Sequence, residues 1–409
     1  MPAAKRALRV TAVAASAQLG GTERVLLDFA ARAFEHDLVL RVLTPRDGPL
    51  IGILNEIGVP AAAIPASAQM LRGSQRAGSL WSLPGSLAGL VAWARKLGRH
   101  EFLRDADVIY SVAFKTHLAI AWLRRHPVVW HLHEYPPAVT GAAWRLLSRS
   151  VPDAMIANSD ATAAAWSVTP PTAHGSQHTA HVIRNGVDLD RFHPRPRTHW
   201  IHDRLGIPHQ HRIIGMPAVF ARWKGQLEVI RAFTEVGAQF RDVHLVFLGG
   251  SIYDTVAERE YGALLQRAVN GVNVHLLPFK AKIEMAYPEF DLTLHYSLRP
   301  EPFGRVVLES LASGVPVIAA REGGPVEILG DAEPQGQRTA DDGQRPTSGW
   351  LVAPRNVAAL TQTLRQVLSL PAPQLRAMGE AARRRAEDHF SARQFARQVA
   401  DVLRAAALD

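Results

Sequence analysis

Short apolar runs alternate with longer amphipathic stretches along the whole chain, and this alternation constrains the fold more than any other feature of the sequence. Apolar runs of five or six residues are typical of parallel strands buried on both faces, and the amphipathic stretches are typical of the helices that cover them. In the first half, strands are expected at residues 9–14, 38–43, 61–64, 108–111, 128–131 and 154–157. This pattern predicts a doubly wound α/β domain.

The segment from Asn185 to Pro208 interrupts the alternation. It reads NGVDLDRFHPRPRTHWIHDRLGIP, is rich in proline and polar residues, and carries neither a helical nor a strand period. After it, strands are expected at residues 213–219, 244–248, 272–276, 292–295 and 315–320. A chain of 409 residues is long enough for two separate cores. We therefore predict two doubly wound domains, residues 1–185 and 186–389.

The nine residues EPFGRVVLE, from Glu301 to Glu309, combine a loop with the start of an apolar helix. Pro302 and Gly304 precede the helix, so its first backbone N–H groups would point outward, where they and the helix dipole attract anions. The two carboxylates could reach different parts of one elongated ligand. This indicates a cradle for phosphate or sugar oxygens. The alternative is a solvated loop acid beside an exposed ion pair of Arg305 with Glu309.

Two further turns between strand and helix carry candidate binding residues. Gly20 and Gly21 follow the first expected strand, and paired glycines let the backbone approach a phosphate or a sugar closely. Arg222 and Lys224 follow the first strand of the second half, where cations can hold a diphosphate. A plain tight turn and solvated surface charge are the respective alternatives.

His131, His133 and Glu134 follow the strand expected at residues 128–131. Alternation along an extended chain places the two histidines on one side. A metal site with Glu134 as third ligand is one interpretation, but the spacing alone is weak evidence for it, and a histidine that contacts substrate is the favoured interpretation.

Asp188 and Asp190 form a DxD sequence of the kind that binds metal in some nucleotide-sugar enzymes. They lie in a loop beside Asn185 and Gly186, where Asp side chains usually form turns. We expect no metal at this position.

Charge narrows the choice of partners. The net charge is +9, and residues 1–185 carry +7 of it, from 19 basic against 12 acidic side chains. This favours an anionic partner, either a phosphorylated substrate or an acidic membrane surface. Nucleic acid is not expected, because zinc-finger spacing, basic-zipper heptads and basic runs interleaved with aromatics are absent from the sequence.

Residues 80–103 form a basic amphipathic segment that could lie on a membrane surface or pack on its own sheet; packing is the commoner fate. Its apolar positions are Trp81, Leu83, Leu87, Leu90, Val91, Trp93 and Leu97.

The chain has no cysteine, which excludes disulfides and a thiol nucleophile and fits a reducing compartment. The N-terminal sequence MPAAKRALRVTAVAASAQLGG has features of a secretory signal, but it continues directly into a loop and helix, which favours a first strand. We predict a cytoplasmic protein, at the inner membrane face if residues 80–103 bind lipid.

Taken together, these segments resemble the retaining glycosyltransferases of the GT-B fold, specifically glycosyltransferase family four. The resemblance covers almost the whole chain, through GGTERVLLDFA, HLHE, RNGVDLDRFHP, WKGQLEVIRAF, PEPFGRVVLESLASGVPVIAAREGGPVEIL and GWLVAP. It implies two Rossmann-like domains that face one another across a cleft. The second would hold the nucleotide-sugar donor and the first the acceptor, with residues 390–409 returning to the first domain.

The resemblance also implies roles for single residues. Glu309 would bind the ribose hydroxyls, and Glu301 with the backbone of Phe303 and Gly304 would bind the transferred sugar. His133 would contact that sugar near the reacting centre, which makes His133 and Glu301 the predicted catalytic residues.

The diphosphate would be held mainly by main-chain groups. The amides of Arg305 and Val306 would face it, with Gly20 and Gly21 on the other side of the cleft, and Lys224 would neutralise the leaving phosphate.

One position departs from the family pattern. Similar enzymes carry an arginine about five residues before the lysine, and Val219 stands there in this chain. Arg222 is the expected substitute if the loop is shorter or turned.

The implied reaction moves a sugar from a nucleoside diphosphate to an acceptor hydroxyl with retention, with no cofactor and no metal, in cell-envelope polysaccharide or glycolipid assembly. The acceptor would be a saccharide or a lipid-linked saccharide. A phosphorylase or epimerase on the same fold, or a non-catalytic nucleotide-sugar binding protein, is the alternative. A glycosidase is disfavoured because eight positions of helix would rise roughly 12 Å, whereas retaining glycosidases hold their carboxyl groups about 5 Å apart.

Overall fold

The computed structural model describes residues 6–68, 70, 84–121, 123, 126–138, 140–168, 179–250, 255–269, 273–278, 282–330 and 348–408. The chain divides into two compact units: Met1–Gly186 with Ala392–Asp409, and Val187–Ser391. The predicted boundary after residue 185 lies one residue from this division. The last helix belongs to the first unit, to which the family resemblance also assigned it.

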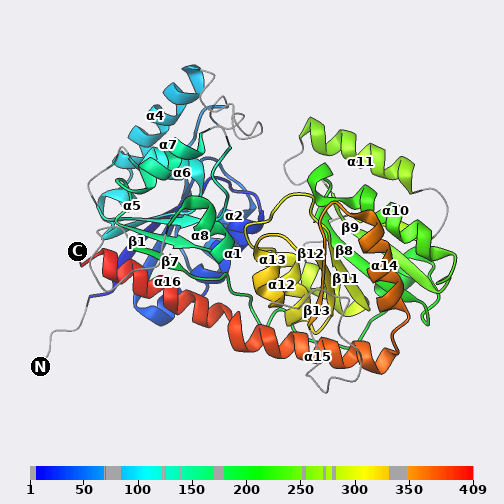
Figure 1. The fold of residues 1–409 in the computed structure, drawn as a ribbon. Coiled ribbons are helices and arrows are strands. Elements are labelled where there is room, and N and C mark those ends of the chain that lie inside the picture. Colours follow the sequence, from blue (N-terminus) through cyan, green and yellow to red (C-terminus); the bar gives the residue numbers. More distant parts are fainter. Residues whose placement is uncertain are drawn as a thin grey trace, which may run out of the picture. The chain divides into compact units, whose positions relative to one another are not determined.

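The first unit is built on a parallel sheet, in which β1 and β7 are labelled in Figure 1. The strand order is β3-β2-β1-β4-β5-β6-β7. Its strands are β1 (Leu8–Val13), β2 (Leu38–Thr44), β3 (Ala61–Ala63), β4 (Val108–Ser111), β5 (Val128–Leu132), β6 (Ala154–Ala157) and β7 (Thr179–Val182). All six predicted strands are present within one residue at each end. The edge strand β7 was not predicted, because its sequence TAHV carries no continuous apolar run.

Helices cover both faces of this sheet. One face packs against α1 (Gly21–Ala30), α2 (Pro49–Glu56) and α16 (Ala392–Ala406). The other packs against α4 (Pro84–Arg99), α5 (Glu101–Arg104), α6 (Phe114–Ala121), α7 (Gly141–Ser148) and α8 (Asp160–Trp166). A short 3-10 helix, η1 (Ala33–His36), precedes β2. The sheet is therefore buried on both sides, as its continuous apolar strands require.

Helix α4 contains the described part of the basic amphipathic segment. Trp93 is buried and donates its indole N–H to the Ile64 carbonyl at 2.8 Å, and Leu90 and Leu97 are buried beside it. Arg95 and Lys96 are exposed, and the Lys96 ammonium donates to the Pro65 carbonyl at 3.1 Å. The apolar face therefore packs on its own unit. Trp81 and Leu83 lie outside the described residues.

Within the described part of the chain, no helix is both long enough and apolar enough to span a bilayer.

The second unit has a parallel sheet with order β10-β9-β8-β11-β12-β13. The strands are β8 (Arg212–Val219), β9 (Val243–Gly250), β10 (Val274–Pro278), β11 (Leu292–His295), β12 (Val317–Ala320) and β13 (Gly349–Val352). Predicted residue 272 lies outside the described chain, and β12 begins two residues later than predicted. Strand β13 was not predicted, because its run GWLV is too short to be distinguished from a loop by period.

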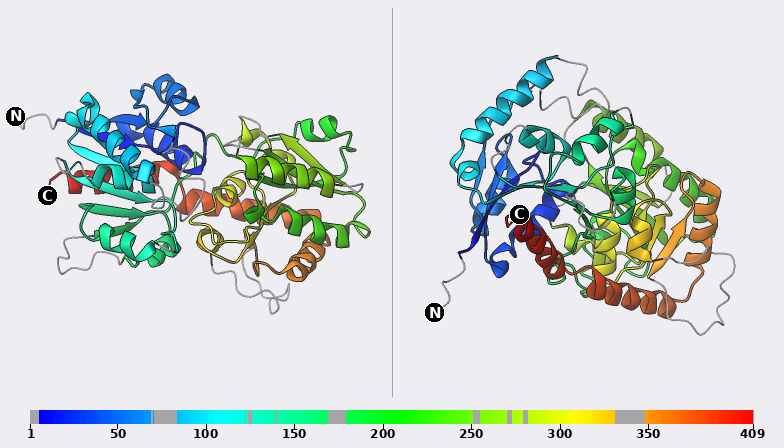
Figure 2. Two further views of the ribbon diagram at one scale, coloured as in Figure 1. Left: turned by 90° about the horizontal axis from the view of Figure 1, so that it is seen from above. Right: turned by 60° about the vertical axis from the view of Figure 1, so that its left-hand side comes forward.

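Helices again cover both faces of the sheet (Figure 2). Helices α9 (Trp200–Leu205), α12 (Arg305–Ala312), α13 (Gly324–Leu329) and α15 (Ala372–His389) line one core, with the 3-10 helices η3 (Ile283–Met285) and η4 (Tyr287–Glu289). Helices α10 (Gln226–Gly237), α11 (Val256–Ala268) and α14 (Val357–Leu368) line the other. Both units thus have the doubly wound architecture in which ligands bind at the carboxyl ends of the strands.

Three histidines form a row where the strands of the second unit begin. His211 Nδ1 lies 3.0 Å from His244 Nε2, and His244 Nδ1 lies 3.0 Å from His275 Nε2. Burial, followed by the neighbouring His275 and His211, lowers the pKa of His244 to about 4. The neutral rings can each donate one N–H to the next.

Acid is expected to destabilise the second unit through His244. Its pKa is about 4 in the folded protein and about 6.5 in an unfolded chain, so the unfolded state binds the proton first. The stability is fully present above about pH 6.5 and falls as the pH drops toward 4, with a loss of about 2 kcal/mol between pH 7 and 5. Urea unfolding at both pH values measures this loss. His244→Gln should flatten the dependence relative to a control, His209→Gln, at an exposed ring; equal slopes would contradict the assignment.

Candidate functional site

A buried carboxylate, Glu301, lies beyond the carboxyl end of β11. Its Oε1 accepts hydrogen bonds from the Lys224 ammonium and the Ser297 hydroxyl. The same oxygen lies 3.0 Å from His295 Nε2. These groups meet because β11 pairs with β8, and Lys224 follows β8 in the 3-10 helix η2 (Arg222–Lys224). The predicted pair Lys224 and Glu301 is therefore brought together from positions 77 residues apart.

The charges around Glu301 keep it ionised. Burial raises the pKa of this carboxyl group, but the nearby charges of His295 and Lys224 outweigh burial and hold the pKa well below its ordinary range. The side chains of Lys224 and Glu301 are only 12% and 11% exposed, so water screens their attraction weakly. The site therefore combines the fixed negative charge of Glu301 with the positive charge of Lys224, which could also interact with a bound anion.

The loop after Glu301 is tied to its neighbours by main-chain contacts. The amide of Gly324 donates to the Glu301 carbonyl at 2.9 Å, and a Cβ atom on Gly324 would overlap the carbonyl of Phe303, which is buried. Gly304 has a φ of 103°, a conformation that favours glycine. Helix α12 begins at the next residue, so this turn fixes where its N-terminus points.

Glu309 is enclosed within the first turns of α12. Its Oε2 accepts the Tyr287 hydroxyl at 2.9 Å, and its Oε1 accepts Arg305 Nε at 3.2 Å. Arg305 and Glu309 do form an ion pair, but their side chains are 13% and 7% exposed. The alternative of a solvated surface pair is therefore wrong. Val306, also in the first turn, is half-buried.

The two cations predicted after β8 point to different places. The Lys224 ammonium donates to the Glu301 carboxylate and also lies 4.1 Å from the ring centroid of Trp223. The exposed Arg222 places its guanidinium carbon 5.8 Å from the ring centroid of Tyr261 on α11. Val219 is the last residue of β8. In this structure Arg222 therefore contacts α11, and its predicted role as the substitute diphosphate ligand stays a prediction.

The first unit carries the remaining predicted residues. Gly20 is buried and is the N-cap residue of α1, with an extended backbone conformation (φ −78°). Gly21 is exposed. A Cβ atom on Gly21 would meet no described heavy atom within 4 Å. This turn therefore leaves room above Gly21 at the carboxyl end of β1.

The histidines after β5 lie together. The rings of His131 and His133 are 3.8 Å apart between centroids, which confirms that both lie on one side. His131 is fully buried against the Tyr110 hydroxyl, and burial, followed by the nearby His133, lowers its pKa well below its ordinary value. His133 is half-buried. Among the described residues, no group of three or more His, Asp or Glu side chains is placed to hold a metal.

The DxD sequence forms a turn. The Asp188 carboxylate accepts the backbone N–H groups of Asp190 at 3.0 Å and Arg191 at 3.1 Å.

Sequence reasoning missed several polar residues of these sites. His295 and Ser297 contact Glu301, and Tyr287 contacts Glu309. A histidine that ends the otherwise apolar strand LTLH is a signal that could have indicated His295, since strand ends carry ligand contacts. In the first unit, burial raises the pKa of Glu23 to about 7 and lowers that of Lys115 to about 8.

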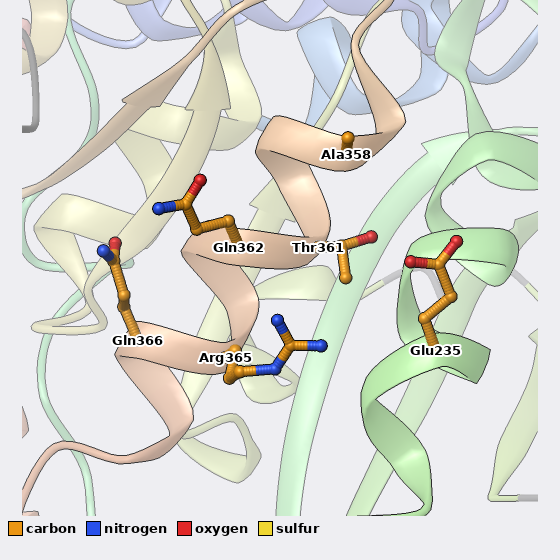
Figure 3. A pocket seen from close by; sticks show the side chains of 6 residues that line it. All are labelled: Glu235, Ala358, Thr361, Gln362, Arg365 and Gln366. Atoms are coloured by element: carbon orange, nitrogen blue, oxygen red, sulfur yellow. The ribbon is translucent and has the colours of Figure 1, made fainter.

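One pocket, of about 570 Å³, lies between α10 and α14 and contains none of the predicted site residues (Figure 3). It is lined by Glu235, Ala358, Thr361, Gln362, Arg365 and Gln366.

Two family models match consecutive parts of the chain. Residues 19–191 match the model described as Glycosyltransferase Family 4, and residues 199–385 match the model described as Glycosyl transferases group 1.

Curated relatives match parts of the chain. A GDP-mannose-dependent alpha-(1-6)-phosphatidylinositol monomannoside mannosyltransferase of Mycolicibacterium smegmatis is 29% identical over 57% of this chain and 58% of its own length. The D-inositol 3-phosphate glycosyltransferase 1 of Catenulispora acidiphila is 27% identical over 72% of each chain. The match to the first of these relatives thus spans somewhat over half of its length.

Solved structures match nearly the whole chain. The Anabaena protein Alr3699/HepE in complex with UDP-glucose is 23% identical, with a TM-score of 0.76 over 97% of this chain and 99% of that one. Sucrose-phosphate synthase from Thermosynechococcus elongatus is 18% identical, with a TM-score of 0.71 over 97% and 98%. At these identities the likeness is one of fold.

Proposed function

The chain belongs to the GT-B glycosyltransferases, with a family 4 domain followed by a group 1 domain, and from this membership we propose that it moves a sugar from a nucleoside diphosphate to an acceptor hydroxyl. The observation that carries the proposal is the buried contact between Lys224 and Glu301 next to the N-terminus of α12. This arrangement offers a cation and a helix end for phosphate and a carboxylate for sugar hydroxyls.

The second unit would bind the donor. Lys224 and the first turn of α12, with Arg305 and Val306, would face the diphosphate. Glu301 with the backbone of Phe303 and Gly304 would accept hydrogen bonds from the transferred sugar.

Glu309 supports a binding role in place of a catalytic one. Both of its oxygens already accept hydrogen bonds, from Tyr287 and Arg305, and its side chain is only 7% exposed, which favours binding over attack on an anomeric carbon. A fixed carboxylate suits recognition of ribose hydroxyls. This supports transfer over hydrolysis by two catalytic carboxylates.

We propose that transfer proceeds with retention at the anomeric carbon. As the bond to the departing diphosphate breaks, the sugar would become oxocarbenium-like, and the leaving phosphate would take the proton from the acceptor hydroxyl. Lys224 would stabilise the negative charge that develops on the phosphate. His133 and Gly20–Gly21 of the first unit are the proposed contacts to the sugar and the diphosphate.

Catalysis is expected to need no divalent metal, because Lys224 and the end of α12 would supply the positive charge that metals supply elsewhere. The rate of sugar transfer should be the same in excess EDTA as in magnesium-containing buffer. Loss of activity on chelation, restored by added metal, would refute this expectation.

The acceptor is proposed to be a saccharide or a lipid-linked saccharide at an anionic membrane surface, in envelope polysaccharide or glycolipid assembly. The basic first unit and the exposed Arg95 and Lys96 of α4 support this, as does the lipid named for the mycolicibacterial relative. Co-sedimentation with anionic vesicles is expected at low salt and not at high salt, because exposed charges are screened. Absence of binding at low salt would remove the membrane part of the proposal.

A panel of UDP-, GDP- and ADP-sugars, each with and without saccharide and lipid-linked acceptors, tests the activity. The proposal expects release of nucleoside diphosphate that rises with acceptor, and a product with the donor's anomeric configuration by NMR. Turnover that needs no acceptor would favour a phosphorylase or an epimerase. Tight donor binding without turnover for any acceptor would favour a binding protein.

A further inference from the structure

Glu301 has two basic neighbours, and the proposed function uses only one of them. Lys224 comes from the segment after β8 and His295 from the end of β11, and both approach Oε1. The imidazole is 3% exposed, and its Nε2 lies 3.0 Å from Oε1 of Glu301. At this distance a protonated imidazole would form an ion pair with the carboxylate of Glu301.

A purely structural explanation accounts poorly for this histidine. Strand β11 is otherwise Leu-Thr-Leu, with Thr293 bonded to the hydroxyl of Ser310. A buried imidazole is less stable there than an aliphatic side chain unless a partner compensates the desolvation of its nitrogens, and the carboxylate of Glu301 lies 3.0 Å away as that partner.

When the donor binds, a second positive group beside the buried carboxylate of Glu301 would be needed. If Lys224 turns toward the diphosphate, as the proposed function requires, Glu301 loses a partner while it stays buried. A buried carboxylate that loses a neighbouring cation is destabilised, so Glu301 would retain Lys224 or take up a proton unless a second positive group stays beside it.

We propose that His295 is a positioning residue that acts as the second counter-ion of Glu301 and thereby releases Lys224 to the diphosphate. His295 stays beside the carboxylate through its place at the end of β11. Glu301 then remains ionised and fixed for the sugar while Lys224 carries the phosphate charge. The inference rests on the proposed function, because it assumes a diphosphate at Lys224.

A thermodynamic cycle tests this role. Isothermal titration calorimetry with UDP, GDP and ADP gives the dissociation constants of the wild type, His295→Leu, Glu301→Gln and the double variant. In His295→Leu, Lys224 is the remaining cation on Glu301, so the dissociation constant should rise about tenfold. In the Glu301→Gln background there is no charge to balance, and His295→Leu should leave the constant unchanged. A structural role would weaken binding in both backgrounds.

Two further variants separate charge from packing. His295→Gln keeps a polar side chain without the charge and should weaken binding as His295→Leu does; wild-type affinity in His295→Gln would overturn the inference. His202→Gln, at a buried ring in α9, is the matched control and should bind like the wild type. Thermal unfolding of each variant shows whether it is folded.

Failure of the inference and failure of the proposed function give different results. If the wild type binds none of UDP, GDP and ADP, or Lys224→Met binds as tightly as the wild type, the diphosphate contact itself is wrong and the inference falls with it. If Lys224→Met weakens binding but His295→Leu does not, the proposed function stands and the counter-ion role is wrong.

Discussion

Replacing Glu301 by alanine is expected to lower the turnover number of sugar transfer by about a hundredfold or more, with a much smaller change in the affinity for nucleoside diphosphate. The carboxylate would bind hydroxyls of the transferred sugar, and contacts that tighten as the sugar becomes oxocarbenium-like lower the barrier. The diphosphate does not touch the sugar-binding side of the loop in this proposal. Steady-state rates and calorimetric binding constants separate the two effects.

Glu235→Ala is the matched control for this substitution. Glu235 is a glutamate of the same unit that lines the pocket between α10 and α14 (Figure 3). Its variant should turn over at the wild-type rate. An unaltered rate in Glu301→Ala, or an equal loss in both variants, would refute the role assigned to Glu301.

Replacing Lys224 by methionine is expected to weaken nucleoside diphosphate binding by about tenfold and to lower turnover by about a hundredfold. The larger effect falls on turnover because the negative charge on the phosphate grows as the sugar leaves. The pKa of Glu301 should rise toward its ordinary range, because one of the two charges that lower it is gone. Activity of the variant should therefore fall further as the pH drops, whereas the wild type should keep an ionised Glu301.

Two other basic residues serve as comparisons. Lys282→Met removes an exposed lysine of the same unit and should have no effect. Arg222→Met decides whether the arginine that contacts Tyr261 in this structure also serves the diphosphate. If Arg222→Met loses as much affinity and turnover as Lys224→Met, the prediction that Arg222 replaces the family's arginine is supported. If Lys282→Met also loses affinity and turnover, the effect is one of general charge.

Local patterns predicted most of the fold. Eleven strands were expected from apolar runs, and each has a counterpart in the structure. Two strands were missed: β7, whose sequence TAHV has no continuous apolar run, and β13, whose run is the short GWLV. The turn at Gly304 and the helix after it could also be predicted, because a proline and a glycine followed by an apolar run are a local signal.

The sequence by itself determined which residue types stand at the strand ends, and the family that those motifs resemble. Glu301, Glu309 and Lys224 could be identified in this way because each belongs to a short motif. Only the tertiary structure decided their partners: His295 and Lys224 meet at Glu301 because β11 pairs with β8, and Tyr287 reaches Glu309 from 22 residues away. Strand order is set by packing between distant segments, and no local period encodes it.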